Sequence, residues 1–169
     1  MSAEATKPAV TYTFSYSEDF FEYKMISNSS VKRLSDEFAG ALQESGDFTS
    51  VSEGSFGGDI YIEAHLLNSG DPAAVIPAFI TGLSLWTIPS WFTDRWYLTT
   101  KVRTADQKEY SYSLEDADIM IQWLPMIVFT PFKFPAVVSQ DVRNNLYRNL
   151  IVQMRKDGIL QKPIVKETP

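Results

Sequence analysis

The chain contains a single histidine, His65, so any hydrolytic site of the serine–histidine–acid type would have to be built around it. Its neighbours Ala64 and Leu66 are apolar and belong to a segment in which side chains alternate, and no Gly-x-Ser-x-Gly nucleophile elbow occurs. We therefore interpret His65 as a residue on the outer face of a strand. A hydrolase that uses His65, Asp116 or Asp118 is an alternative that no constellation of residues in the sequence supports.

A cluster of carboxylates, Glu115, Asp116 and Asp118, follows a predicted strand. Two carboxylates hydrolyse a glycoside only when they face each other across a groove, which sequence neighbours on a turn rarely do. The same oxygens are ligands that Ca²⁺ accepts, but the spacing and the glycine of a calcium loop are absent. We interpret the cluster as solvated acids on a turn and predict no metal site.

Other chemistry-bearing patterns are also missing. The chain has no cysteine, which removes disulfides, thiolate catalysis and cysteine-based metal sites. The glycine-rich segment 54–58 lacks the Lys-Ser or Lys-Thr of a phosphate loop and precedes a strand where that loop needs a helix. We predict a protein that is not an enzyme and that carries no cofactor.

Charge disfavours nucleic acid as the partner. The net charge is −6, and the densest basic run, Arg148–Lys156, lies at the end of a predicted helix, where cations suit the helix dipole.

Aromatic residues carry the most information, at 14% of the chain. They gather in two apolar runs that are broken by prolines, around 72–93 and 119–138. One interpretation is that the rings are core, since tryptophan is highly buried on average. The other is that both runs meet at one end of the sheet as an apolar patch facing a lipid or a protein. The predicted contact residues are Trp86, Trp91, Phe92, Trp123 and Phe132.

The run 72–93 contains no charge and approaches the length of a membrane span. Pro77, Pro89 and Gly82 would break such a helix. We therefore predict a buried strand over 82–88, flanked by apolar loops.

The remaining elements are predicted from periodicity and capping. Alternation predicts strands from residue 10, over 59–67, and in a hairpin with its turn at 105–108. Helical spacing predicts a first helix capped by Ser29 or Ser30 and ended by Gly46, and a second over 136–157 ended by Gly158. The fold class predicted is α+β: a two-layer sandwich whose mainly antiparallel sheet of four to five strands carries two amphipathic helices on one face. We expect a tether over 1–9, a single domain over 10–160 and a loose tail over 161–169.

Three sequence segments resemble segments of uncharacterised proteobacterial envelope lipoproteins. They are ALQESGDF followed by DIYIEAHL, then GLSLWTIPSW before a hairpin, and the final RNNLYRNLIVQMRKDGIL. The resemblance implies a fold similar to the TolB amino-terminal domain and to lipoproteins that assist transport. It also implies a non-catalytic protein on the periplasmic face of the outer membrane that binds a protein or lipid partner as an accessory to transport or assembly. An oligomer is left open.

The first residues, MSAEATKP, lack the pattern of a signal peptide. Either the protein is cytosolic, or this is a mature lipoprotein in which Met1 stands in place of the lipid-bearing cysteine. The alternative function is a periplasmic carrier that holds a small apolar ligand in a cavity between sheet and helices, lined by the same rings.

Overall fold

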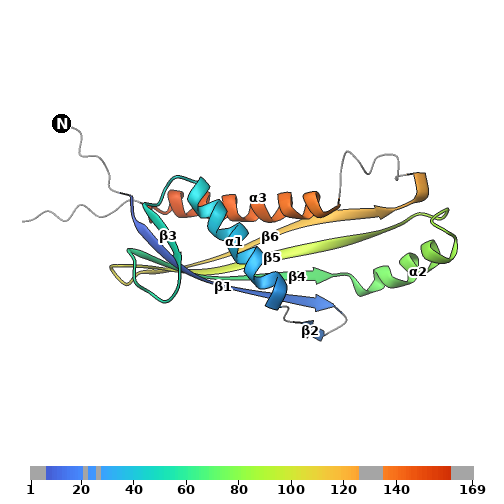
Figure 1. Cartoon of the computed structure of the whole chain (residues 1–169), viewed down its shortest axis with the longest axis horizontal. Coiled ribbons are helices and arrows are strands. Elements are labelled where there is room, and N and C mark those ends of the chain that lie inside the picture. The colour runs from blue at the N-terminus through green and yellow to red at the C-terminus, as the bar shows by residue number, and fades with distance from the viewer. Residues whose placement is uncertain (1–6, 21–22, 26–27, 126–134, 161–169) are drawn as a thin grey trace, which may run out of the picture.

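The computed structural model describes residues 7–20, 23–25, 28–125 and 135–160. It is an α+β fold in which an elongated sheet carries helices on one face (Figure 1). Five strands follow the order β2-β1-β4-β5-β6, and β3 pairs with the start of β1, whereas β2 pairs with its end. The strands are β1 (Ala9–Phe20), β2 (Tyr23–Met25), β3 (Ser50–Glu53), β4 (Ile60–Gly70), β5 (Ser90–Thr104) and β6 (Glu109–Gln122), and the helices are α1 (Asn28–Glu44), α2 (Val75–Leu83) and α3 (Pro135–Lys156), with a 3₁₀ turn, η1, at Pro72–Ala74.

β1 and β4 are parallel neighbours, with Val10 opposite Ile60, whereas β4–β5 and β5–β6 are antiparallel. Parallel strands need a crossover connection, and α1 supplies it. The alternation predicted for β4 is confirmed, because Ile60, Ile62 and the even positions up to Leu66 are buried while His65 is exposed.

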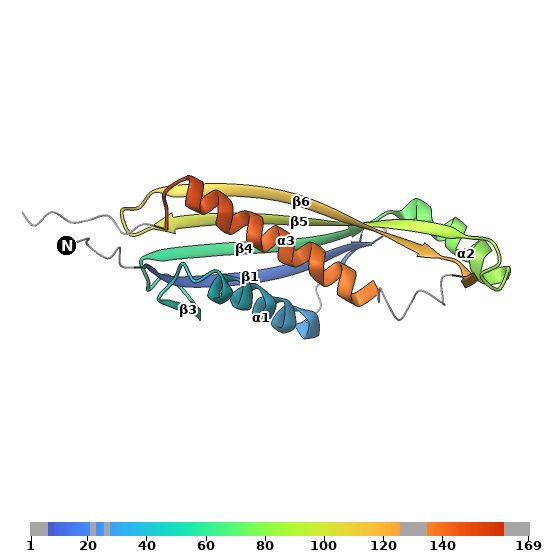
Figure 2. The ribbon, with the colours of Figure 1, turned by 90° about the horizontal axis from the view of Figure 1, so that it is seen from above.

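α1 lies over β1 and α3 lies over β5 and β6, so both predicted helices cover the same face of the sheet (Figure 2). Phe38 of α1 meets Tyr147 of α3 edge-on at a centroid distance of 5.3 Å. Gly46 and Gly158, which follow the two helices, have φ of +68° and +71°, which confirms the predicted left-handed ends. α1 begins at Asn28, slightly ahead of the predicted serine cap.

The β5–β6 hairpin is longer than predicted. β4 accompanies β5 only as far as the pair Gly70–Asp94, and beyond it residues 90–93 pair with β6 alone. The far part of the hairpin therefore extends past the two-layer body, at the opposite end of the molecule from the start of β1 and the end of α3 (Figures 1 and 2).

The buried strand predicted over 82–88 is wrong. Residues 75–83 form α2, and the chain then turns before β5 begins at Ser90. Pro77 is compatible with α2 because it is the third residue of the helix, where a backbone N–H has no intrahelical acceptor to lose. The prediction of a loop after β6 concerns 126–134, which lie outside the described residues, as do 1–6 and 161–169.

Candidate functional site: an apolar tip

The protruding end of the molecule combines α2, the turn 84–89, the paired strand ends 90–93 and 119–122, and residues 123–124. We call these residues the apolar tip. Of the described large apolar side chains that are exposed, most belong to it. Those of the tip are Val75, Ile76, Phe79, Ile80, Leu83, Leu85, Trp86, Ile88, Trp91, Ile119, Ile121, Trp123 and Leu124.

α2 is oriented opposite to an ordinary surface helix. Its inward side carries small residues. Thr81 is fully buried, and Ala78 is half-buried, as is Ala74, the residue just before the helix. Its outward side carries the large apolar residues, with Phe79 66% and Leu83 71% exposed. A helix normally buries its large apolar stripe and exposes its polar side. The exposed stripe on α2 is therefore available for something other than the core.

The turn after α2 satisfies its own polar groups. The hydroxyl of Thr81 donates to the Pro77 carbonyl oxygen at 2.9 Å, and that of Ser84 donates to the Thr81 carbonyl oxygen at 2.9 Å. The Thr87 hydroxyl donates to the Ser84 carbonyl oxygen at 2.7 Å. The Trp86 backbone N–H closes the helix end on the Thr81 carbonyl oxygen at 2.8 Å. The hydroxyls of Thr81, Ser84 and Thr87 are thus bonded within the turn itself.

The two apolar runs meet, as one of the two sequence interpretations proposed. Trp91 of β5 is directly opposite Ile121 of β6, and both side chains are exposed. The Leu124 backbone N–H donates to the Trp86 carbonyl oxygen at 2.8 Å, which joins the end of β6 to the turn after α2. The core interpretation holds for Trp96, which is 5% exposed and stacks on Tyr16.

Four of the five predicted contact residues lie in the tip. Trp86, Trp91 and Trp123 are 49%, 66% and 41% exposed, whereas Phe92 is half-buried. Phe132 lies outside the described residues. The apolar stripe of α2 was not predicted, although the spacing of Ile76, Phe79, Ile80 and Leu83 fits one side of a helix and could have revealed it.

Acidic groups border the tip on the helix-facing side of the sheet. Asp94 is directly opposite Asp118, and burial, then the charges of Asp118 and Glu18, raise the pKa of Asp94. Asp118 is 6% exposed and accepts a hydrogen bond from the Ser139 hydroxyl at 3.1 Å. The interpretation of Asp118 as a solvated turn acid is therefore wrong, because β6 continues through it. Counting back equally from the predicted turn at 105–108 pairs Asp94 with Ile119, which is one residue out of register, because Thr104 already bonds to Lys108 across the turn.

His65 lies where the sequence placed it, on the outer face of β4. Its Nδ1 is 2.8 Å from the Ser15 hydroxyl and its Nε2 is 3.1 Å from the Ser17 hydroxyl. Both ring nitrogens are thus engaged by serines of β1, whereas a catalytic histidine is oriented by a carboxylate. In the described part of the chain, no group of three or more His, Asp or Glu residues is arranged to hold a metal ion.

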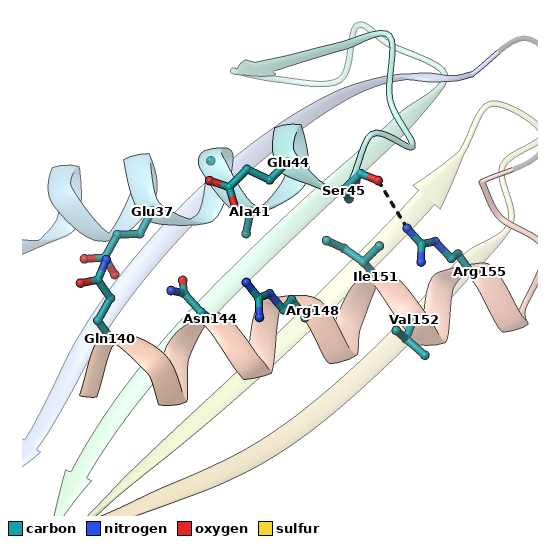
Figure 3. Close-up of a pocket in the computed structure, with 11 residues that line it drawn as sticks. Glu37, Ala41, Glu44, Ser45, Gln140, Asn144, Arg148, Ile151, Val152 and Arg155 are labelled. Carbon is teal, nitrogen blue, oxygen red and sulfur yellow. Dashed lines mark hydrogen bonds between the residues drawn. The ribbon is translucent and has the colours of Figure 1, made fainter. Parts of the chain in front are cut away.

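A groove of about 460 Å³ runs between α1 and α3 (Figure 3). Polar and charged side chains such as Glu44, Asn144 and Arg148 line it, together with Ile151 and Val152. Arg155 closes one end through its ion pair with Asp47 at 2.7 Å. The groove contains none of the predicted contact rings, and it is unlike the ring-lined cavity that the carrier alternative requires.

A smaller pocket of about 190 Å³ lies where η1 and α2 meet β5, and it does include Trp91 and Phe92. It lies where the apolar tip joins the rest of the molecule, outside the layer between the sheet and the helices α1 and α3. Among the described residues, no helix combines the length and the apolar content needed to cross a bilayer.

The arrangement defines an α+β protein with an open, mainly antiparallel sheet, two covering helices and an extended apolar end. Among solved structures, protein XCC0632 from Xanthomonas campestris is similar, with a TM-score of 0.52 and 12% identity over 90% of this chain and 88% of that one. At this identity the likeness shows a shared fold.

Two further solved structures are similar at lower scores. Rare lipoprotein B from Shewanella oneidensis has a TM-score of 0.49 and 8% identity, over 88% of this chain and 96% of that one. A minor lipoprotein from Acinetobacter baumannii has a TM-score of 0.46 and 9% identity, over 90% of this chain and 95% of that one. No protein-family model matches the sequence, and no curated protein matches it.

Proposed function

We propose that this protein is a non-catalytic cell-envelope protein that acts by binding a partner through its apolar tip. The observation that carries the proposal is the orientation of α2, which packs through Ala78 and Thr81 and leaves Ile76, Phe79 and Leu83 in solvent. Fully burying one such side chain stabilises an association by about 1.5–3 kcal/mol. Several of them side by side therefore favour the association of this surface with an apolar partner.

The proposed location in the cell envelope is supported by the sequence segments that resemble those of envelope lipoproteins. In this proposal the protein is held at the periplasmic face of the outer membrane by a lipid anchor and serves an envelope transport or assembly process. The likeness to the TolB amino-terminal domain belongs to the same proposal. What supports it is the α+β class of the fold, a sheet covered by two helices.

The test is site-specific photo-cross-linking in living cells. A photoreactive amino acid replaces Trp91 in the tip in one variant and Val152, 40% exposed on α3, in a control variant. We expect a cross-linked species, protein or lipid, from position 91 and none from position 152. Equal products from both positions, or none from either, would contradict the proposal.

A further inference from the structure

We infer that the partner of the apolar tip is the surface of a lipid bilayer whose headgroups carry little net charge. This inference rests on the proposed function and names the partner that the function leaves open. In it, the large side chains of α2 enter the boundary between headgroups and acyl chains, about 5–10 Å deep, while the two-layer body stays in water.

The first argument is the internal hydrogen bonding of the tip. A protein interface carries roughly one hydrogen bond per 100–200 Å² and a polar rim. In the tip, the hydroxyls of Thr81, Ser84 and Thr87 already donate to backbone carbonyls of the same turn. Ser84 also accepts from the Ile88 backbone N–H at 3.1 Å. The turn after α2 therefore has few directional side-chain groups left for a protein partner.

The second argument is the placement of tryptophan and charge. No charged residue occurs between Asp71 and Asp94, or between Asp118 and Lys133. Trp86, Trp91 and Trp123 lie within the tip, partly exposed, and tryptophan is enriched at the membrane–water boundary. The tip therefore has both the charge-free surface and the amphipathic rings of a membrane-contacting element.

The third argument sets the kind of lipid. Membrane-surface helices that bind anionic lipids carry lysine and arginine on their polar side. Here the charges nearest to the tip along the sheet are mainly acidic, namely Asp94, Glu115, Asp116 and Asp118, with Arg95 paired to Glu115 at 3.3 Å. The whole chain is also acidic, at −6. Attraction must come from apolar burial, and anionic headgroups would repel the border of the tip.

The experiment measures binding of the purified full chain to vesicles by flotation and by the blue shift of tryptophan emission. Vesicles of phosphatidylcholine are compared with vesicles that also contain phosphatidylglycerol, at low and high salt. We expect binding to phosphatidylcholine that is insensitive to salt. Phosphatidylglycerol should weaken it at low salt, with recovery at high salt. Binding that needs phosphatidylglycerol would overturn the choice of lipid.

Two matched variants locate the contact. Phe79→Glu places a carboxylate in the tip, and Phe56→Glu places one at a phenylalanine that is 53% exposed in the 54–58 loop of the body. Because both positions are already exposed, both variants should keep the wild-type circular dichroism and thermal unfolding. We expect Phe79→Glu to lower the partition coefficient about tenfold or more and Phe56→Glu to leave it unchanged. Equal losses would overturn the inference.

The outcomes separate the inference from the proposed function. A wild-type chain that ignores all vesicles but cross-links to a protein from position 91 overturns the lipid partner and leaves the proposed function standing. A dimer in sedimentation velocity that Phe79→Glu dissociates, without vesicle binding, likewise overturns it in favour of a second copy. No vesicle binding, no dimer and no cross-link would contradict both.

Discussion

At the scale of single residues, one buried ion pair links the two covering helices. Arg143 of α3 donates from Nε to Glu37 of α1 at 2.9 Å and from Nη2 at 3.3 Å, and its side chain is 5% exposed. Its guanidinium also lies 5.0 Å from the ring centroid of Trp96 in β5. One arginine thus bonds to α1 and lies over the sheet, so α1, α3 and β5 are coupled through a single side chain.

Replacing Arg143 by methionine should therefore be costly. Glu37 would keep only the longer pairing with Arg33, at 3.8 Å, and removing one partner of a buried pair costs about 3–5 kcal/mol. We expect Arg143→Met to lower the free energy of unfolding by about 3 kcal/mol in urea denaturation. The double variant Arg143→Met, Glu37→Gln should recover part of the loss. Additive losses would contradict this view of the pair.

A second residue-scale prediction concerns pH. Burial and the charges of Asp118 and Glu18 raise the pKa of Asp94 above its ordinary 3.8, so the folded protein holds this proton more tightly than the unfolded chain does. Stability from this group is therefore fully present below pH 3.8 and is lost as the pH rises through the folded pKa. We expect Asp94→Asn to raise the melting temperature at pH 7. The variant's melting temperature should also decrease less than that of the wild type as the pH rises above 3.8.

The control for this change is Asp36→Asn, which removes the same charge from an exposed position of α1. It should leave both the melting temperature and its pH profile close to wild type, because surface charges contribute little. A shift as large as that of Asp94→Asn would mean that net charge, and not the Asp94–Asp118 pair, is responsible.

At the scale of elements, helix ends were predictable because their signals are local. Gly46 has a φ of +68° and open space around it, so an added Cβ would meet no neighbour. Gly40, within α1, also has open space but no positive φ. Substituting alanine at each of the two glycines therefore distinguishes the effect of backbone strain from that of packing.

We expect Gly46→Ala to destabilise the protein by about 1 kcal/mol, because alanine in the left-handed region is strained. Gly40→Ala should stabilise it by about 0.5–1 kcal/mol, because alanine is the better helix former. Chemical denaturation of both variants checks the pair. Changes of the same sign would contradict the left-handed conformation of Gly46 as the difference between the two positions.

At the scale of the whole molecule, the residues that stabilise the fold and the residues proposed to bind a partner lie at different ends. The core joins β1, β4, β5 and β6 to α1 and α3, whereas α2 and the strand ends lie beyond it (Figure 1). In the tip only a few residues, such as Thr81 and Ser90, are buried. The tip is therefore free to carry apolar side chains that contribute to an association and little to folding.

The corresponding prediction uses a dye and a polar variant. Leu83→Gln with Leu85→Gln removes two side chains that are 71% and 72% exposed. We expect bis-ANS binding to fall severalfold while the free energy of unfolding changes by less than about 0.5 kcal/mol per substitution. A large loss of stability would mean that the tip is part of the core.

The sequence alone determined the features that depend on near neighbours along the chain: alternation in β1 and β4, the turn of the hairpin, the glycine ends of α1 and α3, and the absence of charge in the run 72–93. Tertiary structure alone decided that β1 and β4 are parallel, that the hairpin extends beyond β4, and that the large side chains of α2 face outward. These features depend on which elements become neighbours. The same apolar residues can be buried or exposed, and the presence or absence of a packed element beside them decides which. Here β4 stops at Gly70, none of the described elements forms a second layer over the large side chains of α2, and Phe79 and Leu83 are left facing outward.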